Sequence, residues 1–293
     1  LLESEAQRLS ARRPIQVEAA FSAIHNLFDG QVQQRPDAVA AVCEGRSLTY
    51  RAIDRSANRL VKRLLSLGAG PGSVIGLCMY PSLELAAAML AVLKAGAAYV
   101  RLQPNLPGER LARIIAASGL AIILAENRTA ENLPAASARV VLLEQELAGE
   151  GDDSSPPSAA VHPDPESTAC IYYKTSPDGE SQGVEISHRA LWNCLASLRS
   201  APGLSAGDVV LWHGSTPLGL ELFELWLPLS VGARTVIAPE ATVLDGPGFY
   251  NFMEAHGITA MRATPSAWRL LVQSGWRGGQ GLKAISSGEA LLP

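Results

Sequence analysis

The feature that most constrains the fold is an alternation of short β-branched runs with helical patterns, which begins at residue 48 and continues through the chain. One such unit consists of a strand at 73–79, a helix at 84–94 and a strand at 98–102. Two strands that are joined through a helix run parallel in one sheet. The alternation therefore predicts an α/β fold of mainly parallel sheets that are layered with helices.

Further apolar runs predict the remaining strands. They lie at 120–126, 139–143, 168–173, 208–212, 234–238, 258–262 and 282–286. The segment 146–167 is rich in Pro, Ser, Gly and acidic residues, so it cannot bury enough apolar surface to pack. We predict a flexible surface linker there, between a first α/β subdomain at 25–145 and a second, incomplete one at 168–293. Thr264 and Pro265 predict the start of the last helix.

Composition and charge exclude several classes of protein. A chain of 293 residues with 47% apolar and 18% charged residues is typical of globular domains, and it has no apolar run of about 18 residues that could span a membrane. Its net charge of −4, without a basic cluster, argues against a nucleic-acid partner. The four cysteines are too widely spaced for a disulfide framework, so we expect them to be reduced and mostly buried. The polar start at 1–16 has neither an initiator Met nor an apolar signal core, which predicts a cytoplasmic protein and a chain cut from a longer one.

Five sequence blocks, taken in order, resemble the adenylation domain of nonribosomal peptide synthetases. They are LTYRAIDRSANRL at 48–60, LKAGAAYVRLQPNLPGERL at 93–111, GVEISHRAL at 183–191, LELFELWLPLSVGARTVIAP at 220–239 and SGEALLP at 287–293. The segment 1–24 is similar to the interdomain linker that follows a condensation domain. The resemblance implies the large N-terminal subdomains of an adenylate-forming enzyme. Such domains condense a carboxylic acid with ATP to an acyl-adenylate, release pyrophosphate and pass the acyl group to a carrier-domain thiol.

The phosphate-binding loop that the resemblance implies departs from the family pattern. That pattern is roughly T-S-G-S-T-G-x-P-K-G, in which amides, hydroxyls and a lysine offset the phosphate charge. Here Gln182 stands in place of the lysine, and Asp178 and Glu180 add negative charge. The residues of this degenerate loop are Thr175, Ser176, Gly179, Ser181, Gln182 and Gly183. They could still form a hydrogen-bonding turn, but we favour an ordinary surface loop between a strand and a helix.

The implied substrate pocket also departs from the pattern. Family members that activate α-amino acids carry an aspartate that pairs with the substrate ammonium group, and that position is Gly219 here. Glu221 lies two residues on, and its side chain is expected to point away from the Gly219 direction. Arg262 falls on a pocket position, where it would disfavour an ammonium group and favour an anion or a carbonyl. The other implied pocket residues are Leu220, Phe223, Ile285 and Ser287. The opening at 219–223 resembles members that take keto acids; the alternative is a pocket that is no longer used and has drifted in sequence.

Several family features do not occur by Pro293. These are the magnesium- and adenine-contacting segment, the ribose-binding aspartate and the small C-terminal subdomain with its catalytic lysine, so we expect either a truncated chain or a natural fragment. His188 and His213 have no carboxylate or thiol neighbour at a recognisable spacing and are expected to be satisfied structural histidines. The tryptophans are expected in the core or an interface.

Together these departures predict a degenerate, catalytically silent adenylation-like domain that acts as a structural platform in a nonribosomal peptide synthetase. In that case we expect no cofactor, no metal and no catalytic residue in this chain. The alternative is part of an active adenylation domain that selects a non-amino acid such as an α-keto acid and uses ATP and Mg. The expected partners are the condensation and carrier domains of the same synthetase, with a small helper protein as a further candidate, and neither nucleic acid nor membrane.

Overall fold

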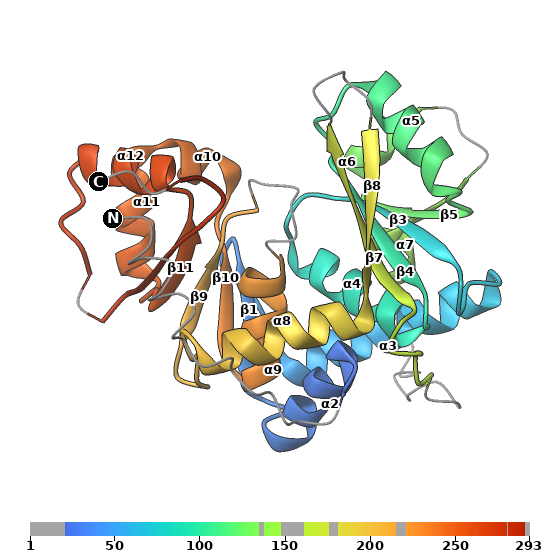
Figure 1. Ribbon diagram of the computed structural model, residues 1–293, viewed down its shortest axis with the longest axis horizontal. Helices are drawn as coiled ribbons and strands as arrows, with labels where there is room; N and C mark the ends of the chain where they lie inside the picture. The colour runs from blue at the N-terminus through green and yellow to red at the C-terminus, as the bar shows by residue number, and fades with distance from the viewer. Residues whose placement is uncertain are drawn as a thin grey trace, which may run out of the picture.

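The computed structural model describes residues 21–134, 138–147, 161–175, 181–214, 221–279 and 281–290. Within them, two six-stranded sheets stand next to each other, with helices between them and on their outer faces (Figure 1). In each sheet most neighbouring strands are parallel. The predicted α/β fold with mainly parallel sheets is therefore confirmed.

The first sheet has the strand order β12-β11-β9-β10-β1-β2. Its strands are β1 Val39–Cys43, β2 Arg46–Thr49, β9 Val209–Trp212, β10 Arg234–Ile237, β11 Ala260–Ala263 and β12 Lys283–Ser286. β2 is antiparallel to β1. The turn between them, Glu44 and Gly45, has φ angles of 48° and 77°, as a two-residue hairpin of the matching twist requires.

The second sheet has the order β6-β5-β3-β4-β7-β8. Its strands are β3 Val74–Cys78, β4 Ala98–Leu102, β5 Ile122–Ala125, β6 Arg139–Leu142, β7 Thr168–Thr175 and β8 Ser181–Ser187. β8 is antiparallel to β7 and forms an edge of the sheet. Each predicted strand is present, with bounds that differ by up to a few residues.

Side-chain caps fix the start of several helices. The helices are α2 Ile24–Gln34, α3 Tyr50–Ser66, α4 Leu83–Lys94, α5 Gly108–Ser118, α6 Asn127–Ala130, α7 Leu143–Leu147, α8 His188–Ser200, η1 Leu222–Trp226 (a π-helical turn), α9 Leu227–Val231, α10 Glu240–Leu244, α11 Gly246–Ala255 and α12 Pro265–Gln273. Thr49 accepts a hydrogen bond from the Ala52 amide, and Ser82 accepts one from the Leu85 amide. The predicted cap at Thr264 is also present, since its hydroxyl accepts from the Ala267 amide at 3.2 Å.

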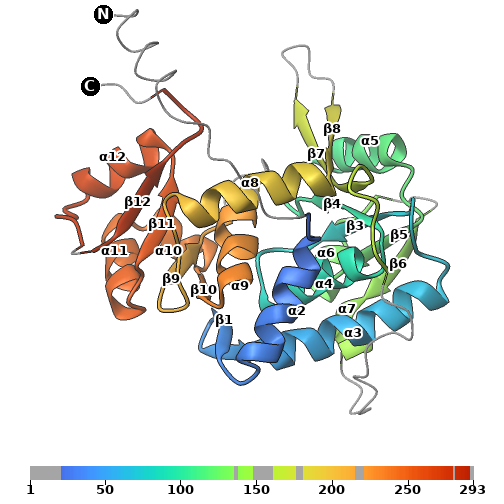
Figure 2. The ribbon, with the colours of Figure 1, turned by 60° about the horizontal axis from the view of Figure 1, so that its bottom comes forward.

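Three clusters of buried side chains hold the layers together. The largest lies between the sheets, where α2, α3, α4, α8 and η1 contribute to one core, and Figure 2 shows α8 crossing between the two sheets. α5 covers the outer face of the second sheet and α11 and α12 cover that of the first. Trp212 and Trp226 belong to the central core, each 1% exposed. α4 is apolar on all sides because it is buried in the middle layer.

Strand pairing crosses the boundary that the sequence placed at 146–167. β1 and β2, at 39–49, belong to the sheet that also contains 209–286, whereas β7 and β8 pair with β4 of the other sheet. Each sheet therefore contains strands from both predicted subdomains, 25–145 and 168–293. The sequence did not predict β1, β2 and β8 as strands. VAAVC and RSLT show neither alternation nor a β-branched run, and in SQGVEIS the alternation is limited to Val184 and Ile186.

Candidate functional site

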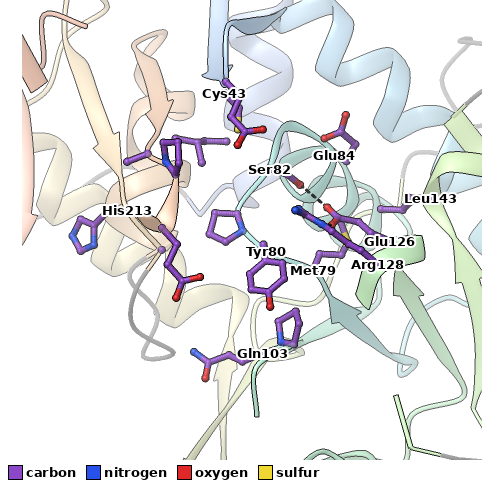
Figure 3. A pocket seen from close by; sticks show the side chains of 18 of the residues that line it. Cys43, Met79, Tyr80, Ser82, Glu84, Gln103, Glu126, Arg128, Leu143 and His213 are labelled. Atoms are coloured by element: carbon purple, nitrogen blue, oxygen red, sulfur yellow. Dashed lines mark hydrogen bonds and ion pairs between the residues drawn. The ribbon is translucent and has the colours of Figure 1, made fainter. Parts of the chain in front are cut away.

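A cleft of about 680 Å³ opens at the carboxyl ends of strands from both sheets (Figure 3). In the first sheet β10 lies on one side of β9 and β11 on the other; in the second, β4 and β5 flank β3 in the same way. In an open parallel sheet, a crevice forms at the carboxyl ends of two adjacent strands whose following connections run to opposite sides of the sheet. His213, after β9, and Met79, after β3, both line the cleft, so the two crevices meet in one space.

Glutamates at helix starts dominate the polar lining of the cleft. Glu84 lies in the first turn of α4, Glu126 caps α6 and Glu240 begins α10. Figure 3 shows Tyr80 in the middle of the cleft, with Glu126 on one side and His213 on the other. These carboxylates already compensate the positive ends of the helix dipoles. The cleft therefore does not present an uncompensated helix start to an anion.

Two ion pairs neutralise part of this acidic lining. Arg46 Nη2 lies 2.6 Å from Glu84 Oε1, and Arg128 Nε lies 2.6 Å from Glu126 Oε2. The guanidinium of Arg128 also lies 5.1 Å from the centroid of the Tyr80 ring. Both arginine side chains are largely exposed, so these pairs set the charge of the cleft more than they stabilise the fold.

The structure brings together Arg262 and Ser287, two residues of the predicted substrate pocket. Arg262 Nε donates a hydrogen bond to Ser287 Oγ at 2.5 Å, at the carboxyl ends of β11 and β12. Burial lowers the pKa of Arg262, while the neighbouring Glu224 acts in the opposite direction. Phe223 is 3% exposed in the central core and Ile285 packs against that core. The predicted residues Gly219 and Leu220 lie outside the described part of the chain.

His213 has a carboxylate neighbour that sequence spacing did not reveal. His213 Nε2 lies 2.9 Å from the Arg262 carbonyl oxygen and 3.3 Å from Glu224 Oε1. Glu224 is fully buried within the π-helical turn η1, a local form that often occurs at functional sites. Burial first, and then the charge of Glu221, raise the pKa of Glu224 well above its usual value, whereas burial lowers the pKa of His213. In both groups burial therefore favours the neutral form.

A buried ion pair joins the second sheet to the start of η1. Arg101 Nη1 lies 3.1 Å from Glu221 Oε1, and the two side chains are 9% and 6% exposed. Arg101 Nη2 also donates to the Met79 carbonyl oxygen at 3.3 Å. Sequence analysis could not find this pair, because its members are 120 residues apart and no motif links them. Arg101 lines the cleft, so the pair lies where the cleft meets the segment that carries Phe223 and Glu224.

The predicted phosphate loop is part of a β-hairpin. Ser181, Gln182 and Gly183 lie in β8 and pair with Thr175, Lys174 and Tyr173 of β7. The expectation of an ordinary loop leading from strand to helix is therefore wrong for 181–187, which forms a strand. Directly opposite residues of antiparallel strands have side chains on the same face, so Lys174 shares a face with Gln182. Ser176, Gly179 and the side chain of Thr175 lie outside the described residues.

The remaining predicted residues divide between confirmed and corrected expectations. Trp192, Trp212 and Trp226 are buried, as expected. His188 is 1% exposed, and within the described residues neither ring nitrogen has a hydrogen-bond partner, so it is not the satisfied histidine that was expected. All four cysteines are free; Cys78 and Cys170 are buried, Cys43 is half-buried and Cys194 is exposed.

Two further searches covered the described residues alone. No group of three or more His, Cys, Asp or Glu side chains among them is arranged to hold a metal ion. No helix among them combines the length and the apolar character needed to cross a membrane.

Comparison with known proteins gives consistent matches across the chain. Residues 28–293 match the family described as AMP-binding enzyme. The chain is 31% identical over 267 residues to the PKS-NRPS hybrid synthetase acdB of Aspergillus candidus. The aligned residues cover 89% of this chain and 10% of that protein. It is 32% identical over 276 residues to tyrocidine synthase 3 of Brevibacillus parabrevis, covering 94% of this chain and 4% of that protein. The chain thus spans a tenth or less of the length of these two relatives.

Solved structures agree on the fold. The N-terminal subdomain of NpsA from Klebsiella oxytoca superposes with a TM-score of 0.82 at 22% identity, over 94% of this chain and 70% of that one. The four-domain nonribosomal peptide synthetase holo-AB3403, bound to AMP and glycine, superposes with a TM-score of 0.80 at 26% identity, over 92% of this chain and 20% of that one.

Proposed function

Because this chain belongs to the family of AMP-binding enzymes and corresponds to the N-terminal part of an adenylation domain, we propose that it is a catalytically silent structural platform within a nonribosomal peptide synthetase. One observation carries the proposal. Arg262 and Ser287, two residues of the predicted substrate pocket, bind each other at 2.5 Å. Polar groups that satisfy each other must be separated before they can bind a substrate, and that separation costs binding free energy.

The charges around the pocket support the same conclusion for α-amino acids. A substrate ammonium group needs a buried carboxylate as its partner. Glu221 is already paired with Arg101, and burial raises the pKa of Glu224, which favours its neutral form. Among the described residues of this region, the carboxyl groups are therefore already committed, and Arg262 adds a positive charge that repels an ammonium group.

The described residues of the hairpin do not fit a triphosphate well. β8 is largely exposed, and Gln182, which carries no charge, stands where the resemblance implies a lysine. We therefore derive no step of catalysis through ATP. As a platform, the chain would use its folded core to hold the condensation and carrier domains of the same synthetase in place, in the cytoplasm and with a small helper protein as a further partner.

Calorimetric titration with ATP–Mg tests the silent platform. We expect a dissociation constant weaker than about 1 mM, which corresponds to about −4 kcal/mol. The matched variant Gln182→Lys should not raise the affinity, because β8 is largely exposed and solvent screens a single charge there. Micromolar affinity of the unmodified chain, about −8 kcal/mol, would contradict the proposal.

A second function is favoured by the register of the hairpin. Lys174 lies opposite Gln182, and the buried Ser181 hydroxyl has no hydrogen-bond partner among the described residues. These two groups would contact the phosphates of ATP if the chain were part of an active ligase for a non-amino acid. The β- and γ-phosphates of ATP would then leave as pyrophosphate, Mg would offset their charge, and Arg262 would favour a substrate with a keto group.

Pyrophosphate exchange with α-keto acids distinguishes the second function from the first. An active ligase should show exchange above background, Lys174→Ala should abolish it and Lys174→Arg, which keeps the charge, should retain most of it. Background exchange with a panel of α-keto acids leaves the silent platform as the better account.

A further inference from the structure

The buried pair of Arg101 and Glu221 has hydrogen-bonding capacity that it does not use. Glu221 Oε2 and Arg101 Nε are both buried, and neither has a hydrogen-bond partner among the described residues. A guanidinium and a carboxylate that satisfy each other fully form two parallel hydrogen bonds. Here one oxygen of Glu221 accepts one bond, from Nη1 of Arg101. The pair is therefore an incompletely satisfied charge site in the interior.

Arg101 is the cation that makes the buried Glu221 carboxylate tolerable. Burial of a carboxylate costs free energy, which a neighbouring cation offsets. Tyr99, Tyr172 and Glu224 also interact with Glu221, but the first two are phenols whose pKa values are raised first by burial, and Glu224 is a second carboxyl. Arg101 is the described cation that pairs with the Glu221 carboxylate.

The position of the pair makes it reachable by a small ligand. Arg101 lines the cleft of about 680 Å³, a volume within the range that holds small organic molecules. Glu221 immediately precedes η1, which carries Phe223 and Glu224. The pair thus lies between an open space and the region of the predicted substrate pocket.

We propose that Arg101 is a specificity-determining residue: its guanidinium fills a cation site formed by Glu221 and thereby excludes ligands that carry an ammonium group. The proposal rests on the proposed function for the location of the pocket, and it explains by a described contact why an α-amino acid is not accepted. Without the charge of Arg101, Glu221 would bind a small organic ammonium ion that enters from the cleft.

Removal of the guanidinium from the full chain tests the proposal. Arg101→Met keeps most of the apolar stem, and Arg51→Met is the matched control because it breaks an exposed pair, with Asp37, that does not line the cleft. The probes are n-butylammonium and the neutral n-butanol, which have the same chain length. We expect n-butylammonium to bind Arg101→Met at least tenfold more tightly than the unmodified chain, as measured by NMR titration, while n-butanol does not discriminate between them.

The double variant Arg101→Met/Glu221→Gln identifies the binding group. It should return the affinity for n-butylammonium to that of the unmodified chain, whereas the control Arg51→Met should leave the affinity of the unmodified chain as it is. Equal affinity of the unmodified chain and Arg101→Met, or undiminished binding by the double variant, would overturn the proposal.

The single variant Glu221→Gln decides the matter if Arg101→Met does not fold. It leaves the guanidinium without its carboxylate, so n-butyrate should bind at least tenfold more tightly than to the unmodified chain; no gain would overturn the proposal. None of these probes contains a nucleotide. Micromolar ATP–Mg binding would therefore refute the silent platform while leaving this result unchanged, and the two failures can be told apart.

Discussion

Acid should destabilise this protein through His25, a buried histidine on α2. The side chain is 4% exposed, and its Nδ1 has no hydrogen-bond partner among the described residues. Burial first, and then electrostatic interactions with His188 on α8 and Lys94 on α4, lower the pKa of His25 from 6.5 to about 3, while a hydrogen bond with the Val161 backbone acts in the opposite direction. The folded protein therefore holds this imidazole in its neutral form.

The sign of the effect follows from proton uptake on unfolding. Between pH 6.5 and about 3 the unfolded chain binds a proton at His25 that the folded chain does not bind. The stabilisation is complete above pH 6.5 and is lost as the pH falls toward 3. At pH 5, about 1.5 units below the unfolded pKa, this group alone should lower the free energy of unfolding by about 2 kcal/mol.

Urea denaturation at pH 7 and pH 5 measures this loss. His25→Gln cannot take up a proton, so its free energy of unfolding should fall by about 2 kcal/mol less than that of the unmodified chain between the two pH values. His256→Gln is the control, because His256 is only partly buried at the end of α11 and bonds to the Phe252 carbonyl oxygen. If the unmodified chain and His25→Gln lose the same free energy, the assignment of the acid sensitivity to His25 is refuted.

Four further outcomes can be measured. Trp226→Ala should lower the free energy of unfolding by about 3 to 5 kcal/mol in denaturant titration, because the ring is 1% exposed, and it should abolish product formation by the parent synthetase. Gln182→Ala should leave the product yield unchanged. A collapse of that yield would mean that the hairpin still takes part in chemistry. Tyr50→Phe should cost about 1 kcal/mol by removing the buried hydrogen bond of 2.7 Å to the Ala233 carbonyl oxygen, and an unchanged denaturation midpoint would contradict that. Pyrophosphate exchange should stay at background with the proteinogenic amino acids. Gly219→Asp alone should not raise the exchange, because Arg262 would still repel the ammonium group. Clear exchange by the unmodified chain would refute the pocket assignment.

The fold was readable from the sequence wherever a strand was buried on both faces. Runs such as VIGLC in β3 and IILA in β5 lie in the middle of a sheet and carry an unbroken apolar signal. β8 lies at an edge with most of its side chains exposed, so no apolar pattern marks it. The sequence could not show which strands share a sheet, because the order of strands along the chain does not determine which of them pair. β1, for example, pairs with β10 from the other half of the chain.

The candidate site was predictable only where a motif fixed the positions. The structure shows Arg262 and Ser287 in contact, and their role in a substrate pocket stays a prediction. The pairs Arg101 with Glu221 and His213 with Glu224 could not be predicted, because each joins residues that are close only after folding. The expectation that Glu221 points away from the Gly219 direction stays a prediction. The described partner of Glu221 is Arg101, which lies in β4 of the second sheet.

The pairing of β1 with β10 also governs how the chain can be made. Val42 pairs with Val236, so the hairpin of β1 and β2 leaves the ribosome long before its parallel neighbour exists. At synthesis rates of about 5 to 20 residues per second, that edge waits about 10 to 40 s for its partner. A nascent chain with an unpaired strand edge can pair with another chain and aggregate. A chaperone that covers this edge would therefore matter most during this interval. It also means that cutting the gene within the 146–167 linker should yield two halves that fold only when they are produced together.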